Sequence, residues 1–484
     1  MAHIEFLDET IRDGQQSLWG MRMQAGMALP VAPILDKTGF RVIDCTGSSF
    51  FEVLIKNCHE NPWEGLDMMR GAMPNTPLRA GMRSNAAVTF GVTPDALMDA
   101  WMRQLNVHGC RSFWIYDVLF NTDKTLRLAK VAKEFGSEVA GSIMFTTSPV
   151  HTDEYYGARA AELSASDDID TLLLYDTGGT LERERLKTLV PALIANANGK
   201  PIEFHSNNLL GQSDKAYLDA IEFGVSILHT SSRPLANGPA VPSTENTVAN
   251  IEMLGHTHNL DHTCFEPVAE HFEKVGKAAG FLVNQYADYN VLAIQHQIPG
   301  GMVGTLRAQL AEHDMLDRLE DVFRETAVVR RELGYPGMAT PFSQLVGIQA
   351  VLNIVTGKRY SVIPDEVIQY AAKYYGETVA EIEPNVLDQI MSAPRAKEIL
   401  ANPPEQPSIE ELRKRFGVDN DDDLILEALV AGTGLDAMKE AGPVRRDYPL
   451  LSSPELDYVR KLMGHVKSPV LEVVTEDFSL SLRR

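Results

Sequence analysis

The 484-residue sequence has only four cysteines and no long hydrophobic run. The cysteines form no CxxC pair, which indicates reduced thiols in a cytoplasmic protein rather than a disulfide-stabilised one. No stretch of 18 apolar residues occurs, so we expect no membrane span. The opening residues, MAHIEFLDET, lack a basic segment followed by an apolar core, so we expect no secretion signal.

Positive charge is also scarce. Lys and Arg number 44 against 66 Asp and Glu, which gives a net charge of −22. Such a charge repels nucleic acid and anionic membrane surfaces, so neither is an expected partner. An anionic substrate would therefore need a local basic pocket.

Eight short apolar runs, each followed by a helical pattern, occupy the first part of the chain. Eight strand–helix units over about 250 residues predict an α/β fold of the (β/α)8 TIM-barrel type. A doubly wound open sheet is the alternative, but it usually carries a glycine-rich phosphate loop after its first strand, and none is present. The runs lie at residues 4–7, 42–45, 78–82, 112–118, 139–145, 171–176, 202–205 and 226–230.

From about residue 276 the pattern becomes mainly helical. We therefore expect a barrel domain over 1–275 and a helical C-terminal extension over 276–484. Residues 297–302 are expected to form a turn between helices, and Thr340 precedes a proline at an expected helix start. Residues 356–409 and 409–441 have helical patterns broken by glycine and proline. The acidic run 419–423 is typical of a solvated loop and helix N-terminus.

Charged and polar side chains stand at the expected strand ends, where barrels of this type bind their ligands. Each alone has a simpler explanation as a helix cap or a turn-closing ion pair. Together they are typical of a metal-assisted site for an anionic oxo acid, since arginines bind carboxylates and carboxylates bind metals. They are Arg12, Asp13, Asp44, Arg83, Asp117, Thr146, Tyr175, Asp176, His205, Asn207 and His229.

Several separated motifs resemble the carboxyltransferase domain of biotin-dependent carboxylases, the family of pyruvate carboxylase, the oxaloacetate decarboxylase α subunit and the transcarboxylase keto-acid subunit. Residues 12–19, RDGQQSLW, resemble R-D-[AG]-H-Q-S-L, and residues 61–66, NPWEGL, resemble D-P-W-E-R-L. Residues 147–156, TSPVHTDEYY, are close to the decarboxylase sequence. The stretches QIPGG at 297–301 and TPFS at 340–343 resemble E-I-P-G-G and T-P-S-S.

The resemblance implies a barrel whose mouth is covered by a helical funnel, and a homodimer. It implies that Arg12 and Gln16 line a keto-acid pocket and that Arg83 binds the substrate carboxylate. It implies that Thr340 carries a proton between biotin and the enol. Tyr175 faces the substrate in this interpretation.

Two departures affect the metal site that the resemblance implies. The metal-binding lysine of K-D-M-A-G is replaced by Tyr175, and the second histidine of H-T-H is replaced by Asn207. We predict a divalent ion (zinc, manganese, magnesium or cobalt) held by Asp13, His205 and Asn207, more weakly than in relatives with the lysine. The alternative is a metal-free pocket filled by Tyr175.

Two further motifs are interpreted as incidental. His256, His258 and His262 have metal-like spacing but lie past the last strand, as expected of loop histidines. The AMK at 437–439 resembles a biotinylation site, but the residues before it are helical rather than the strands of a biotin domain. Biotin would therefore come on a separate carrier protein.

The predicted function is carboxyl transfer between a biotinyl carrier and a small anionic keto acid, in company with carrier and biotin carboxylase subunits. The alternatives are a biotin-independent carbon–carbon lyase or aldolase on the same barrel, and a catalytically silent structural subunit of a carboxylase complex. Thr340 and Arg83 favour the first, and Tyr175 favours the other two.

Overall fold

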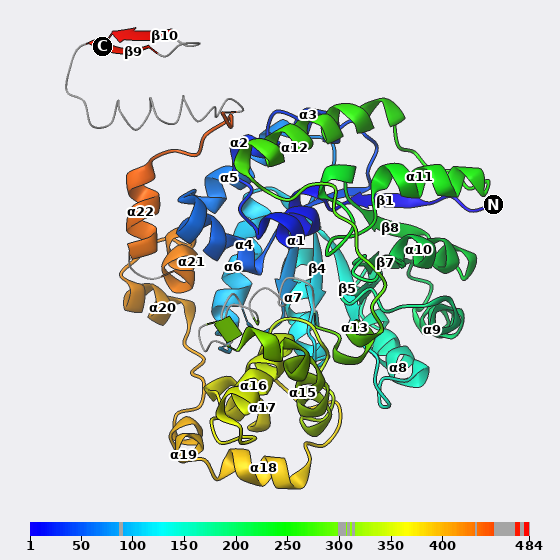
Figure 1. Ribbon diagram of the computed structural model, residues 1–484, viewed down its shortest axis with the longest axis vertical. Coiled ribbons are helices and arrows are strands. Elements are labelled where there is room, and N and C mark those ends of the chain that lie inside the picture. Colours follow the sequence, from blue (N-terminus) through cyan, green and yellow to red (C-terminus); the bar gives the residue numbers. More distant parts are fainter. Residues whose placement is uncertain are drawn as a thin grey trace.

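Eight parallel strands close into a barrel in the order β1 to β8, as the computed structural model of the chain shows (Figure 1). The barrel closes where Glu5 pairs with Ile227 and Asp8 with Thr230. The predicted (β/α)8 fold is confirmed. The strands are β1 (Glu5–Asp8), β2 (Val42–Gly47), β3 (Leu78–Arg83), β4 (Cys110–Tyr116), β5 (Glu138–Met144), β6 (Thr171–Asp176), β7 (Ile202–Ser206) and β8 (Ile227–Thr230). The structure describes residues 1–86, 91–298, 306, 310–311, 315–430, 433–449, 470–474 and 479–483.

The strands are continuous apolar runs because helices cover the sheet on its outer face and side chains fill its inner face. All six residues of β6 are buried, and so are all six of β3. The inner face is unusually polar, since Arg79 on β3 forms an ion pair with Glu203 on β7 across the barrel, at 2.6 Å. Both side chains are fully buried.

The helices surround the barrel as Figure 1 shows. The helices up to residue 279 are α1 (Gln15–Trp19), α2 (Ala25–Ala28), α3 (Ala32–Leu35), α4 (Ser48–Val53), α5 (Pro62–Ala72), α6 (Asp95–Val107), α7 (Thr122–Lys133), α8 (Asp153–Ser164), α9 (Arg183–Asn196), α10 (Ser213–Glu222), α11 (Thr244–Met253) and α12 (Phe265–Ala279). Short helical turns occupy Thr10–Gly14, Leu54–Cys58, Arg233–Leu235 and His262–Cys264.

The part after residue 279 is mainly helical, as expected. Its described helices are α13 (Val291–His296), α15 (Leu319–Glu332), α16 (Phe342–Thr356), α17 (Asp365–Ala371), α18 (Pro384–Met391), α19 (Pro394–Ala401), α20 (Ile409–Phe416), α21 (Asp421–Leu429) and α22 (Thr433–Ala441), with a short turn at Leu316–Arg318. Strands β9 (Val470–Val474) and β10 (Ser479–Arg483) form an antiparallel pair that the helical pattern did not predict.

Some expected boundaries in this part are revised. Helix α16 begins at Phe342 and Pro341 is its N-cap residue, so the proline precedes the helix instead of opening it. Residues 357–364 and 372–383 are not helical, so the pattern over 356–409 is several short helices. The acidic run is confirmed as a helix start, with Asn420 capping α21. The expected turn at 297–302 lies partly outside the described residues.

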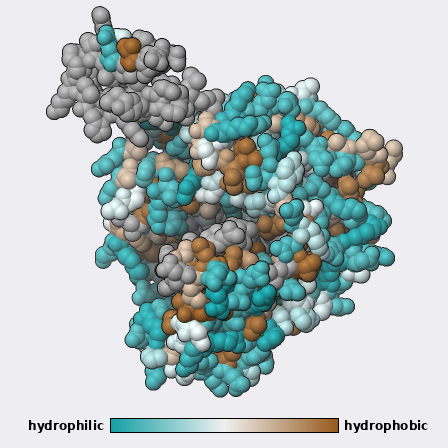
Figure 2. Space-filling model, in the orientation of Figure 1, coloured by the Kyte–Doolittle hydropathy of each residue, from teal (hydrophilic) through white to brown (hydrophobic). Residues whose placement is uncertain are grey.

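One hydrophobic core joins the barrel to the extension. The same cluster of buried side chains contains Phe113 on β4, Phe342 on α16 and Tyr370 on α17. The face seen in Figure 2 is mostly hydrophilic, with hydrophobic residues in small groups. Among the described residues, none of the helices combines the length and the apolar character that crossing a membrane requires.

Candidate active site

A cavity of about 100 Å³ lies at the carboxyl ends of the barrel strands, where β1, β2, β3, β4 and β6 meet the loop before α16. All five residues predicted for catalysis or substrate binding line it. They are Arg12, Gln16, Arg83, Tyr175 and Thr340, from segments up to 328 residues apart in the sequence. The three predicted metal ligands do not line this cavity.

Arg83, at the end of β3, is held rigidly in the cavity wall. Its Nε donates to the hydroxyl of Tyr116 at 3.0 Å, and its Nη2 donates to Ser49 Oγ at 3.0 Å. The residue is 5% exposed, and among the described residues no carboxylate pairs with it. A buried guanidinium with neutral partners has unused attraction for an anion, so an anionic group of a ligand is its expected partner.

Arg12 is the most strongly tethered side chain of the site. Its Nη2 lies 2.6 Å from Glu9 Oε2, its Nε donates to Asp44 Oδ2 at 3.1 Å, and its Nη1 donates to the Tyr175 hydroxyl at 3.2 Å. It also stands over the Trp114 ring, 5.0 Å from the centroid. Burial, and next the Glu9 charge, raises the pKa of Asp44 to about 7 although Arg12 acts in the opposite direction.

Tyr175 stands on β6 where the related lysine would ligate a metal. Burial raises the pKa of its phenol, and the nearby Arg12 charge offsets only part of this rise. The raised pKa favours the neutral phenol. Because its oxygen accepts a hydrogen bond from Arg12, its own hydrogen is available to a ligand oxygen in the cavity.

A stack of four rings runs along this wall of the barrel. Trp114 lies between Tyr116 and Tyr175, 5.0 Å from each centroid, and Tyr175 stacks on His205 at 4.2 Å. Gly81 makes room for the stack, because a Cβ there would lie 2.5 Å from the Trp114 ring. The stack fixes the Tyr175 ring independently of its hydroxyl.

The predicted metal ligands lie together, at the tips of β1 and β7. Asn207 Nδ2 donates to both Asp13 oxygens, at 3.1 and 3.2 Å, and the Val241 amide donates to Asp13 Oδ2 at 3.0 Å. His205 Nε2 lies 3.7 Å from Asp13 Oδ1 and has no hydrogen-bond partner in the part of the chain that the structure describes. The amide of Asn207 thus presents N–H groups to Asp13, so the three residues supply two ligand atoms and do not fit a three-ligand site as they stand.

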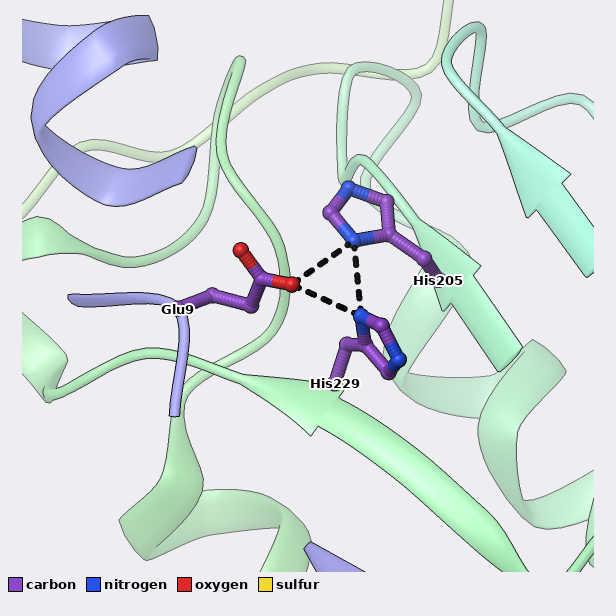
Figure 3. Close-up of side chains that lie close together, drawn as sticks. All are labelled: Glu9, His205 and His229. Carbon is purple, nitrogen blue, oxygen red and sulfur yellow. Dashed lines mark hydrogen bonds and ion pairs between the residues drawn. The ribbon is translucent and has the colours of Figure 1, made fainter. Parts of the chain in front are cut away.

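Glu9 was not predicted from the sequence as a site residue, and His229 was predicted only as one of the polar strand-end side chains. Glu9 Oε1 lies 2.7 Å from His229 Nδ1 and 3.5 Å from His205 Nδ1, and the two Nδ1 atoms are 3.3 Å apart (Figure 3). All three side chains are fully buried and meet at the ends of β1, β7 and β8. Burial opposes ionisation of Glu9, but Arg12 and the two imidazoles outweigh it and hold the pKa of Glu9 well below its usual range.

Thr340 reaches the cavity on a loop that a buried arginine attaches to the barrel. Arg330, near the end of α15, donates from Nε to the Pro336 carbonyl at 3.1 Å. It also donates from Nη2 to Thr146 Oγ1 at 2.7 Å and from Nη1 to the Thr147 carbonyl at 2.9 Å, just beyond β5. These bonds fix the loop four residues before Thr340 against the barrel mouth.

The motifs interpreted as incidental lie outside the cavity. His258 Nε2 and His262 Nε2 each lie 3.0 Å from Glu252 Oε1, so these three residues form a second group of metal-ligand composition. However, His258 Nδ1 accepts the Leu260 amide at 3.0 Å, which requires the hydrogen of a neutral ring to sit on Nε2. That nitrogen is then a donor to Glu252, not a ligand. The AMK sequence lies in α22, as expected.

Comparison with known proteins relates the chain to carboxylases. Residues 293–464 match the family model described as a conserved carboxylase domain. The chain is 33% identical over 436 residues to one of the subunits of pyruvate carboxylase from Methanocaldococcus jannaschii, covering 88% of this chain and 76% of that protein. It is 32% identical to the 2-oxoglutarate carboxylase large subunit of Hydrogenobacter thermophilus, covering 79% and 59%. It is 28% identical to the methylmalonyl-CoA carboxyltransferase 5S subunit of Propionibacterium freudenreichii subsp. shermanii, covering 78% and 74%.

Solved structures share the fold. The carboxyl transferase domain of Rhizobium etli pyruvate carboxylase with pyruvate has a TM-score of 0.83 at 20% identity, covering 99% of this chain and 83% of that chain. The same domain with oxamate and biotin has a TM-score of 0.82 at 21% identity, covering 91% and 79%. At such low identity the likeness is one of architecture.

Proposed function

This chain belongs to the family of biotin-dependent carboxyltransferases, and on that premise we propose that it moves a carboxyl group between a biotinyl carrier protein and a small keto acid. The observation that supports the proposal most is the cavity at the barrel mouth. Arg83, without a carboxylate partner among the described residues, faces the same 100 Å³ space as Arg12, Tyr175 and Thr340. An anion-binding group, an electrophile and a hydroxyl are what the reaction needs in one place.

Arg83 and the Arg12–Tyr175 pair have separate roles in this proposal. Arg83 binds the carboxylate of the keto acid, since a guanidinium held by two hydroxyls presents its remaining N–H groups in a fixed plane. Arg12 and the Tyr175 hydroxyl donate to the keto oxygen and stabilise the negative charge that develops there as the enolate forms. Gln16, exposed at the rim, contributes a further donor to the substrate.

Thr340 carries the proton. In the carboxylation direction, the bond between the biotin nitrogen and the carboxyl carbon breaks, and that carbon forms a bond with the methyl carbon of the enolate. The proton that leaves the methyl group passes through the Thr340 hydroxyl to the biotin nitrogen, so the hydroxyl is regenerated. The reverse sequence decarboxylates the product, and the same residues serve both directions.

In this proposal the carrier and the biotin carboxylase are separate subunits of a cytoplasmic complex. The carrier is separate because the AMK sequence at 437–439, which resembles a biotinylation site, lies in a helix. The barrel over 1–275 is the catalytic domain, and 276–484 forms the funnel that receives the carrier. We also propose a homodimer. Light scattering at micromolar concentration should give twice the mass of the chain, and a monomer mass would contradict the dimer.

The experiment uses the purified chain with a keto acid and a biotinylated carrier domain. We expect loss of the β-carboxyl group of an oxaloacetate-type substrate only when the carrier carries biotin, and inhibition by avidin. Turnover without biotin would instead show a lyase. No turnover together with stable binding of the carrier would show a structural subunit. Either result would overturn the proposal.

A further inference from the structure

We infer that Glu9, His205 and His229 form a divalent-metal site inside the barrel, which shares His205 with the predicted set of Asp13, His205 and Asn207. Figure 3 shows Glu9 Oε1 and the two Nδ1 atoms converging on one point. The inferred ion is a transition-metal dication such as zinc or cobalt, because two imidazoles and one carboxylate are typical ligands of those metals.

The spacing of the three atoms suits a metal. Atoms bound about 2.0–2.1 Å from zinc in tetrahedral arrangement lie about 3.3 Å apart. The distances here are 3.3 Å between the two Nδ1 atoms, 3.5 Å from Glu9 Oε1 to His205 Nδ1, and 2.7 Å from Glu9 Oε1 to His229 Nδ1. Only the last, now a hydrogen bond, has to open by roughly half an ångström.

The far nitrogen of each imidazole faces a carboxylate, as it commonly does in histidines that bind metals. His229 Nε2 lies 3.0 Å from Glu203 Oε2, and His205 Nε2 lies 3.7 Å from Asp13 Oδ1. A hydrogen on each Nε2 leaves both Nδ1 lone pairs directed at the same point as Glu9 Oε1. Asp13 then acts through His205, which agrees with its oxygens being occupied by Asn207 and the Val241 amide.

The buried charges also favour a dication. The connected network holds four carboxylates but two guanidiniums, Arg12 and Arg79, and every member is at most 2% exposed. With neutral imidazoles this leaves two negative charges, which one dication would balance. The metal-free alternative protonates imidazoles or Asp44 instead. The four carboxylates are Glu9, Asp13, Asp44 and Glu203.

The ion would act on the site through Glu9. One oxygen of Glu9 binds the ion and the other pairs with Arg12 Nη2 at 2.6 Å, so the metal fixes the carboxylate that orients the arginine of the cavity. Glu9 and His229 are therefore positioning residues and do not touch the substrate. The inference extends the proposed function but does not depend on it, since metal binding is measured without turnover.

The experiment measures metal content after expression in medium supplemented with zinc or cobalt, without a histidine tag. We expect about one equivalent in the wild type and less than about a tenth in Glu9→Gln and His229→Gln. Asn207→Ala should keep the full equivalent of metal. If the metal were instead bound by Asp13, His205 and Asn207, this variant would lose it. His262→Gln is the matched control, because it disrupts the exposed Glu–His–His group and should also keep the ion.

X-ray absorption spectroscopy on the wild type provides a second test, and it needs no variant that could misfold. Two imidazole nitrogens in the metal shell are expected, whereas the set of Asp13, His205 and Asn207 would give one. A wild type with less than a tenth of an equivalent, a full equivalent in His229→Gln, or a single imidazole would overturn the inference. Biotin-dependent turnover in a metal-free wild type would overturn it and leave the proposed function intact.

Discussion

Tyr175 and His205 stack face to face, with ring centroids 4.2 Å apart and planes inclined by 19°. The resemblance implied a metal-binding lysine at position 175, and the aromatic ring that stands there makes a packing contact instead. The stack orients the imidazole, and the hydroxyl of Tyr175 joins Arg12 in the cavity. Tyr175 therefore contacts both His205 of the His205–His229 pair and the cavity that Arg12 lines.

Tyr175→Phe should lower kcat by about a hundredfold, because it removes one donor to the developing enolate. The ring stack with Trp114 and His205 persists in the variant, so the fold should be retained, and the melting temperature should fall only because Arg12 Nη1 loses an acceptor. Steady-state kinetics and thermal denaturation check the two parts. Tyr374→Phe, which removes a hydroxyl outside the cavity, is the control. Equal kcat in wild type and Tyr175→Phe would show that the Tyr175 hydroxyl does not stabilise the enolate.

Arg83→Lys should raise KM for the keto acid at least about tenfold, since an ammonium cannot reproduce a planar, two-point contact with a carboxylate. The fold should be retained, because the groups that lose the guanidinium as a donor are the neutral hydroxyls of Tyr116 and Ser49. Arg103→Lys, in an exposed ion pair with Glu134, should leave KM unchanged. If Arg83→Lys had the KM of the wild type, Arg83 would not bind the substrate carboxylate.

Arg330→Met should destabilise the protein by about 2–4 kcal/mol, because the buried Thr146 hydroxyl and the buried Pro336 carbonyl each lose a donor. It should also lower kcat, since the Pro336 carbonyl and with it the Thr340 loop are released. Arg330→Lys should not rescue either property, because one ammonium cannot serve acceptors on both the loop and the barrel. The neighbouring Arg331→Met, at an exposed ion pair with Glu383, is the control. Full activity in Arg330→Met would show that the loop holds its position without it.

His151 should make the protein sensitive to acid. Burial, with smaller contributions from Arg330 and Arg185, lowers the pKa of His151 from 6.5 to about 3. Between these two pH values the unfolded chain binds the proton and the folded protein does not. The free energy of unfolding therefore decreases as the pH drops below about 6.5. The slope contributed is at most about 1.4 kcal/mol per pH unit. Urea unfolding from pH 7 to pH 5 should show a shallower decline in His151→Gln, and parallel curves would contradict this assignment.

Local periodicity was enough to predict the barrel. Residues 171–176 form a strand with the bounds that their apolar run indicated, because a strand buried on both faces has a nearly continuous apolar sequence. Parallel strand ends meet at one side of a closed barrel, so Asp13 and Asn207 were expected to be neighbours and are hydrogen-bonded. The cavity residues Arg83 and Thr340 were identified through the family resemblance.

What the sequence left open depends on side-chain direction and long-range contact. Glu9 and His229 are 220 residues apart, and nothing local to either indicates that the other will be its partner. The direction of the Asn207 amide follows from Asp13 and was not inferable from residue type. The strand pair β9–β10 is short and lies beyond the last helical pattern predicted, at 409–441, so no periodic pattern indicated it.

The central claim is that Thr340 and the cavity below it transfer a carboxyl group to and from biotin. The most direct measurement follows a labelled β-carboxyl group from an oxaloacetate-type keto acid onto the biotinylated carrier. We predict stoichiometric label on the carrier with the wild type and with Thr340→Ser, which keeps the hydroxyl, and a loss of about a hundredfold in transfer rate with Thr340→Ala. Equal labelling of the carrier by Thr340→Ala, or no labelling by the wild type, would contradict it.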